Sequence, residues 1–212
     1  MATSVDKASV VNQIQTMNAV YNSVGLNLVL TATTLTVNDA WSIGAGSDLD
    51  AAKQALRQGT YADLNLYFHT NLTGGILGTC TLPTSVPSDC DPVVYASDGC
   101  NIHAGTMPGG STYGYNSGLT AVHEAGHWFG LLHTFEGDSC SGDGDFIADT
   151  RQESVSTSGC PTSPAKNSCP DLPGNDPIHN YMDYSIDACY EAFTSLQEER
   201  MHDLWQAYRQ GH

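Results

Sequence analysis

Four residues of this chain, His123, Glu124, His127 and His133, have the types and the spacing needed to hold and use a metal ion. His123 and His127 are one helical turn apart, so both imidazoles leave the same face of a helix and can bind one ion. Glu124 follows the first histidine, where its carboxylate can take a proton from a metal-bound water. Gly130 tolerates positive φ and allows the sharp turn that brings His133 round as a third ligand. Three protein ligands leave one position of a tetrahedral zinc ion open for water, which is typical of a catalytic site.

The length of this pattern decides how specific it is. The short form, His-Glu-x-x-His, recurs by chance, and a helix with surface histidines is an equal alternative for it. Gly130 and His133 each make a chance match about twentyfold less frequent, because each fixes one residue type. Met182 lies downstream in Asn-Tyr-Met-Asp-Tyr. A single methionine is more often core filling, but in this position it fits a turn whose thioether packs beneath the metal site.

The zinc pattern and Met182 together resemble the pappalysin family of metzincin peptidases, and most closely its secreted fungal extracellular metalloproteases. Beyond the zinc helix, the matching residues are 106–111, 133–135, 144–145, 148–150, 159–161, 176–184 and 193–194. The first hundred residues match the family more loosely. The resemblance implies a zinc endopeptidase with an α+β fold. Its upper lobe has a twisted mixed sheet and the active-site helix, and its irregular lower lobe is stapled by disulfides.

We therefore expect residues 1–212 to form one catalytic domain, with the upper subdomain at about 1–130 and the lower at about 131–212. In this scheme Glu124 is the general base. Tyr184 matches a tyrosine that in related metzincins reaches the zinc or the developing oxyanion, with a packing role as the alternative. A catalytically silent zinc-binding or adhesion domain on the same scaffold is the alternative function. Such a domain would have no need for Glu124, so its presence beside three ligands favours catalysis.

The chain has seven cysteines and no Cys-x-x-Cys pair, which favours disulfides in an oxidising compartment and hence secretion. The resemblance implies two disulfides in the lower lobe, Cys140–Cys169 and Cys160–Cys189. For the third we predict Cys80–Cys100, which leaves Cys90 free, although Cys80–Cys90 closes an equally plausible loop. The first residues lack the apolar stretch of a signal peptide, so we expect a mature or trimmed form with an added start Met.

An acidic loop follows the zinc helix. Its residues Asp143, Asp145, Asp149 and Thr150 offer oxygen ligands that suit calcium, and the resemblance places calcium in this region. A solvated acidic loop is an equal alternative. The family usually has proline after Asp-Thr, whereas this chain has Arg151.

A second carboxylate, Asp187, lies in the segment after Met182 that, in metzincins, builds the pocket for the residue following the scissile bond. A carboxylate in that pocket would favour Arg or Lys in the substrate. The alternative is that Asp187 faces solvent, which would leave an apolar pocket and broad cleavage.

The net negative charge of the chain restricts the classes of molecule that it can bind. The formal net charge is −16, with only seven Lys and Arg in 212 residues. Nucleic-acid binding needs basic patches, and an acidic membrane surface would repel this protein. We expect a monomer that acts on proteins or peptides, binds zinc, has calcium as a second candidate ion, and has neither nucleic-acid nor membrane partners.

Hydrophobic periodicity places the elements around the site. We predict helices at 10–24, 49–58, 118–129 and from 194 onward, and strands at 26–37, 64–68, 76–82 and 102–107. The residues from 134 to 181 are rich in Gly, Pro, Ser and Asp and indicate irregular structure. The family opens with a further strand before the first helix. This chain begins almost at the helix, so we expect the sheet to lack that strand.

Overall fold

The computed structural model describes residues 5–87 and 89–212, so the expectation about the first four residues lies outside the described part. Its α-helices and strands are α1 (Lys7–Tyr21), α2 (Gly46–Leu56), β1 (Leu66–His69), β2 (Gly78–Cys80), β3 (Cys100–His103), α3 (Leu119–Trp128) and α4 (Ser195–Tyr208). Short 3-10 helices lie at Asn22–Val24, Trp41–Ile43, Thr73–Gly75, Pro92–Tyr95, Ala104–Thr106 and Asp187–Cys189. No helix in these ranges is long and apolar enough to cross a membrane.

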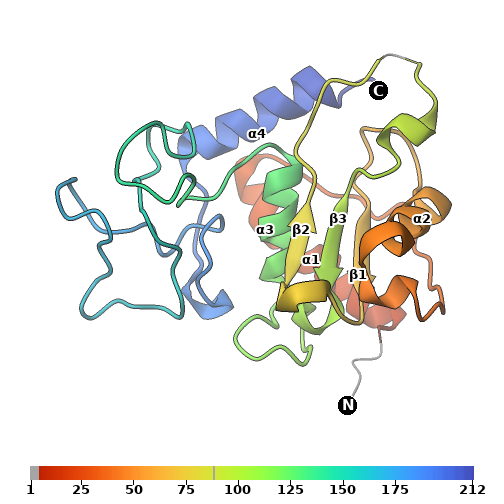
Figure 1. Cartoon of the computed structure of the whole chain (residues 1–212), viewed down its shortest axis with the longest axis horizontal. Helices are drawn as coiled ribbons and strands as arrows, with labels where there is room; N and C mark the ends of the chain where they lie inside the picture. The colour runs from red at the N-terminus through yellow and green to blue at the C-terminus, as the bar shows by residue number, and fades with distance from the viewer. Residues whose placement is uncertain (1–4, 88) are drawn as a thin grey trace.

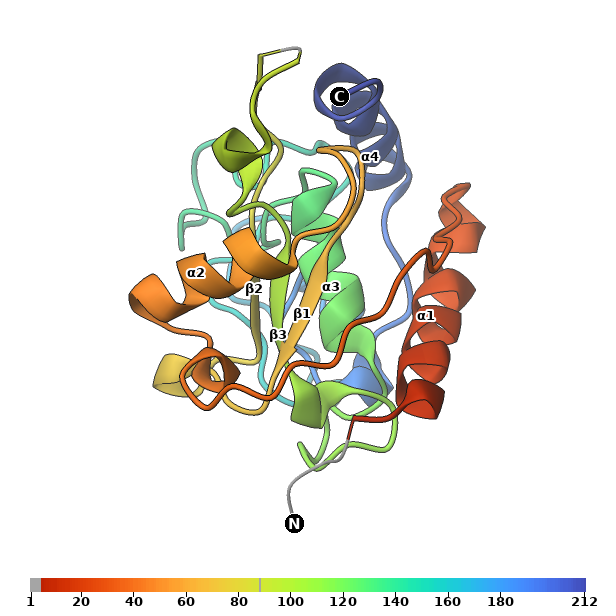
Figure 2. The same ribbon diagram turned by 90° about the vertical axis from the view of Figure 1, so that its right-hand side faces the viewer.

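The three strands form a mixed sheet in the order β1-β3-β2. β1 runs parallel to β3, and β2 runs antiparallel to it. Figure 2 shows α2 on one side of this sheet and α3 with α1 on the other. The core between α1, α3 and the sheet contains Met17, Tyr21, Ile102, Val122 and Trp128. The predicted α+β fold with a mixed sheet is therefore confirmed.

The first helix fixes the position of the zinc helix. Asp6 caps α1 by accepting a hydrogen bond from the Ser9 backbone N–H. On the buried face, the Tyr21 hydroxyl donates to the carbonyl oxygen of Val122 at 2.7 Å. The Gln13 amide donates to the carbonyl oxygen of Gly118, the residue before α3, at 2.9 Å. Because both acceptors belong to α3 or its cap, α1 sets the height and the rotation of that helix.

The strand predicted at 26–37 is wrong. These residues form no helix or strand, and the sheet ends at β1 within the described ranges. The backbone of Leu28 is instead satisfied by the Asn18 side chain, with both hydrogen bonds at 2.8 Å. Alternating apolar residues make a stable strand only beside a neighbour that pairs with their backbone groups. Without one, Leu35 and Val37 are left 80% and 94% exposed.

Residues 131–186 contain no helix or strand, as predicted, and lie at the left of Figure 1. Disulfides Cys140–Cys169 and Cys160–Cys189 staple this region, and Cys80–Cys100 joins β2 to β3. All three predicted pairings are confirmed, and Cys90 is free. α4, the helix predicted from 194 onward, then runs from these loops to above the sheet (Figure 1) and begins with a capping box at Thr194 and Gln197.

Candidate metal centre and catalytic site

Three imidazoles converge at the end of α3. Nε2 of His127 lies 3.2 Å from Nε2 of His123 and 3.2 Å from Nε2 of His133. Nδ1 of His123 lies 2.7 Å from the carbonyl oxygen of Tyr181, and Nδ1 of His127 lies 2.8 Å from that of Leu131. A carbonyl only accepts, so each Nδ1 carries the proton and each Nε2 presents a lone pair.

The facing lone pairs of His123 and His127 cannot hydrogen-bond to each other, and a cation bound by both would relieve their repulsion. Two nitrogens bound tetrahedrally to one zinc ion at about 2.0–2.1 Å would lie about 3.3 Å apart, close to the observed spacing. Burial lowers the pKa of His127, and burial with the neighbouring His127 lowers that of His133 to about 4. Burial, followed by His127 and His133, holds the pKa of His123 well below its usual value. Neutral imidazoles are the form that binds metal.

A turn at Gly130 brings the third histidine to the other two. Gly130 has φ +101°, and a Cβ atom there would lie 2.2 Å from Cδ1 of Leu204 on α4. Both the conformation and the close approach of α4 therefore require glycine. The Gly130 carbonyl accepts a hydrogen bond from Nε of Arg200 at 2.8 Å, so α4 holds this turn in place.

Met182 is fully buried directly against the zinc helix. A Cβ atom at Gly126 would lie 2.6 Å from its sulfur, so the thioether fills the space that the glycine leaves. The backbone of Met182 also accepts a hydrogen bond from the N–H of Thr134 at 3.2 Å. Met182 thus contacts the helix of the first two histidines and the segment of the third. Two residues on, the Tyr184 hydroxyl lies 3.1 Å from Nε2 of His133.

Glu124 is buried between α3 and the edge strand β2. It is 5% exposed, and Oε2 has no hydrogen-bond partner. A Cβ atom at Gly78 of β2 would lie 2.4 Å from Oε1. Burial raises the pKa of Glu124 to about 8. Sequence reasoning missed Gly78, because a glycine in a short strand carries no signal of which distant side chain approaches it.

Asp187 is buried, so the solvent-facing alternative does not hold. Its Oδ2 accepts a hydrogen bond from the Ser117 N–H at 2.6 Å, and its N–H donates to the carbonyl oxygen of Gly114 at 2.9 Å. Oδ1 is buried without a partner. Burial raises the pKa of this carboxyl group, against the opposing effect of Ser117. Asp187 thereby ties the loop before α3 to the segment after Met182.

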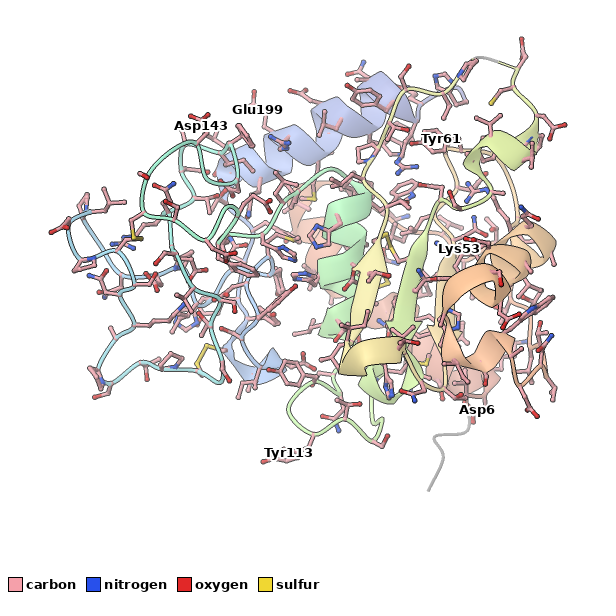
Figure 3. The ribbon with its side chains drawn as sticks, viewed as in Figure 1. Asp6, Lys53, Tyr61, Tyr113, Asp143 and Glu199 are labelled. Atoms are coloured by element: carbon pink, nitrogen blue, oxygen red, sulfur yellow. A yellow bond between two sulfur atoms is a disulfide. The ribbon has the colours of Figure 1, made fainter. Side chains whose placement is uncertain are left out.

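Two carboxylates of the predicted calcium loop, Asp145 and Asp149, accept hydrogen bonds from the protein. Asp149 accepts hydrogen bonds at the start of α4, from the Thr194 hydroxyl at 2.7 Å and the Leu196 N–H at 3.0 Å. Asp145 is buried and accepts from the Ile147 N–H at 3.1 Å. Asp143 is exposed beside α4 (Figure 3), and Thr150 is buried. Calcium in this loop stays a prediction.

Two sets of metal-ligating side chains converge in the described part of the chain. One is the histidine triad, and the other is Cys160, His179 and Cys189. The two sulfurs of the second set are joined in a disulfide, so they offer no thiolate to a metal. The histidine triad is therefore the metal site that the geometry supports.

Three histidines around one point, a carboxylate beside them on a helix and a methionine turn beneath define a metallopeptidase site of the metzincin class. The family model described as pregnancy-associated plasma protein-A, peptidase M43, matches residues 51–206. The chain belongs to this family, the pappalysins, and is a zinc metalloendopeptidase.

Similar curated proteins are described as extracellular metalloproteases. An extracellular metalloprotease of Neurospora crassa is 52% identical over 93% of this chain and 67% of its own length. One from Pyricularia oryzae is 48% identical over 96% of this chain and 69% of its own length. With three disulfides, which persist outside the reducing cytosol, the protein is a secreted enzyme.

A solved structure shares the fold. Mature mirolysin of Tannerella forsythia, in complex with a cleaved peptide, superposes with a TM-score of 0.73 at 26% identity. The match covers 95% of this chain and 86% of that one. The predicted metzincin-like fold is confirmed.

Proposed function

We propose that the protein hydrolyses peptide bonds within extended chains, with zinc held by His123, His127 and His133 and Glu124 as the general base. The observation that carries this proposal is the convergence of three imidazole Nε2 atoms next to a buried carboxylate on the same helix. Residues 1–212 act as one catalytic domain, with the cleft between the parts at about 1–130 and 131–212. The bound zinc would supply a Lewis acid and lower the pKa of its water.

The chain's own groups handle protons and orientation. Glu124 accepts a proton from the attacking water and passes it to the leaving amine. Its burial keeps bulk water away from that carboxylate, which strengthens its interactions with nearby charge. The Tyr184 hydroxyl, at 3.1 Å from His133 Nε2, is placed to donate a hydrogen bond to the oxyanion that develops on the substrate.

The edge strand β2 supports an extended substrate. β2 pairs with β3 on one side only, and its Gly78 lies against Glu124. An extended peptide that pairs with this free edge gains main-chain hydrogen bonds with little dependence on sequence. Because Gly78 has no side chain, the Glu124 carboxylate can pack directly against β2, next to a peptide paired with that edge.

Zinc is expected to bind at about one ion per chain and to be required for hydrolysis. Purified protein treated with a chelator should lose its peptidase activity, and added zinc should restore it. His133→Ala should bind zinc more weakly, because it removes one of three ligands. The matched control, His212→Ala, should keep both zinc and activity. Metal analysis and a quenched peptide substrate measure the two quantities, and full activity in metal-free protein would exclude the proposal.

Asp187 is proposed to set a preference for Arg or Lys after the scissile bond. Its buried Oδ1 lacks a partner, and a cationic side chain in the pocket would supply one. A charge-assisted contact of about 1.5–3 kcal/mol corresponds to about tenfold to a hundredfold in selectivity.

We expect Asp187→Ala, and Asp187→Asn with its retained acceptor for Ser117, to lower the Arg-to-Leu ratio of kcat/KM by about tenfold or more. The peptides compared differ only at that position and are measured in moderate salt, which screens the acidic surface. Glu191→Ala, whose carboxylate side chain is 70% exposed, is the control. An unchanged ratio in both Asp187 variants would show that another group sets specificity.

A further inference from the structure

Lys166 lies inside a cage of oxygen atoms within the irregular loops of residues 131–186. Its Nζ is 2.8 Å from Oε2 of Glu153, 3.0 Å from Oγ1 of Thr157 and 3.2 Å from Oδ2 of Asp176. It also donates to the carbonyl oxygen of Val155. Two carboxylates, a hydroxyl and a carbonyl are the mixture of donors with which proteins bind calcium. Here the charge at their centre belongs to the chain itself.

The cage needs a cation because its oxygens are withdrawn from water. Glu153 is fully buried, and Asp176 and Thr157 are 5% and 2% exposed. Buried carboxylates are strongly unfavourable without a partner. Burial alone would lower the pKa of Lys166, but the hydrogen bonds to Glu153 and Asp176, with the charges of Glu153 and Asp183, hold that pKa above its usual value. The ammonium group is therefore charged at neutral pH.

A second side-chain cation, Arg151, adjoins the first. Its guanidinium donates to Oδ1 of Asp176 at 3.0 Å, so Asp176 lies between Arg151 and Lys166. Its remaining donors reach five more oxygens, those of Gln152 O, Asn167 Oδ1, Cys169 O, Leu172 O and Pro173 O. Arg151, which stands where the family usually has proline, thus gathers loop carbonyls around a fixed positive charge.

The cage is connected to the catalytic site by two short paths. The other carboxylate oxygen of Glu153 accepts a hydrogen bond from the hydroxyl of Thr134 at 2.6 Å, and Thr134 directly follows the metal ligand His133. The backbone N–H of Thr157 donates to Oδ1 of Asp183 at 2.9 Å, between Met182 and Tyr184. Lys166 therefore binds Glu153 and Thr157, and these two residues hydrogen-bond to the segments that carry His133 and Tyr184.

We propose that Lys166 is a built-in cation that does in this lobe what a bound calcium ion would do, and that it is a positioning residue for the segments of His133 and Tyr184. Removing its side chain converts the cage into a calcium site. An ion can enter from solution, because Lys166 and Asp176 also line a surface hollow of about 240 Å³. The proposal concerns the stability of the cage and the zinc affinity, and it does not depend on which peptides are cleaved.

The test compares Lys166→Ala with the parent by thermal unfolding of zinc-loaded protein, in buffer with no added divalent ion, with calcium or with magnesium. We expect the variant to unfold at a lower temperature than the parent. Millimolar calcium should remove this difference in unfolding temperature, which is called the gap below. Magnesium should leave the gap, because it demands smaller octahedral geometry. Calcium bound at Asp143–Thr150 would stabilise parent and variant alike and would also leave the gap. A gap that calcium does not reduce would overturn the proposal.

Four further experiments test whether calcium acts at the Lys166 cage. Adding Glu153→Gln to Lys166→Ala should abolish the rescue by calcium, and a rescue that persists would place the ion elsewhere. Chelator competition should show weaker zinc binding in Lys166→Ala and recovery with calcium, whereas unchanged zinc affinity would exclude the positioning role. Lys7→Ala, at the exposed start of α1, should change none of these quantities. If Lys166→Ala does not fold, calcium should restore its refolding yield, and no yield in calcium contradicts the proposal.

Discussion

Glu124→Gln is expected to retain zinc and to lose nearly all peptidase activity. The substitution keeps the size of the side chain in its space between α3 and Gly78, and it leaves the three histidines unchanged. It removes the only function that the proposal gives this residue, the transfer of a proton. Because general acid–base catalysis contributes about 10²–10⁴-fold, kcat should fall by at least about a hundredfold while the zinc content stays at the parent level.

The measurement is kcat on a peptide substrate together with zinc content by metal analysis. Glu199→Gln, on the outer surface of α4 (Figure 3), makes the same chemical change away from the site and should behave like the parent. Full activity in Glu124→Gln would remove the general-base assignment. Loss of zinc in that variant would instead show that the carboxylate supports metal binding.

Arg209→Ala is expected to destabilise the fold by about 3–5 kcal/mol, because it removes the closer of the two guanidinium partners of buried Asp98 together with the side chain that packs on Trp128. Arg209 is fully buried. Its guanidinium donates to both carboxylate oxygens of Asp98 at 3.1 Å, and its Nε donates to the carbonyl oxygen of Trp128 at 3.1 Å. It also stacks over the Trp128 ring at 3.7 Å and the Tyr61 ring at 4.4 Å.

Urea unfolding of zinc-saturated protein measures this loss. Gln206→Ala, at an exposed position of the same helix, should change the free energy of unfolding by no more than about 0.5 kcal/mol. Equal effects of the two substitutions would mean that α4 contributes through its helical backbone rather than through the buried ion pair.

The parts of the site that lie close together in the sequence could be predicted from it. The spacing of His123, His127 and Gly130 records the geometry of one helix and one turn, and that geometry does not depend on the rest of the chain. The capping box at Thr194 was equally local. The two lower-lobe disulfides and Met182 join distant segments, and they were predictable through the family resemblance, whereas Cys80–Cys100 was one of two equally plausible loops.

The remaining features depend on long-range packing that leaves no local pattern. The alternation at 26–37 predicted a strand, but a strand also requires a neighbour, and the sheet ends at β1. The hydrogen bonds of both Asp149 oxygens to the start of α4 also join segments 45 or more residues apart, so the composition of the acidic loop could not predict them. The partners of Lys166 come from residues 153–176, in a region without periodicity, so the composition showed charges but not their pairing.

The contact of Arg209 with the end of α3 has a consequence for biosynthesis. Arg209 and Trp128 are separated by 81 positions in the chain, and Arg200 holds the Gly130 turn from the same late helix. During translation, the zinc helix leaves the ribosome well before the two arginines that fix its last turn. The nascent chain therefore carries all three histidines before it can hold them in register. We therefore expect the three histidines to reach their final register only after α4 has been released and has docked.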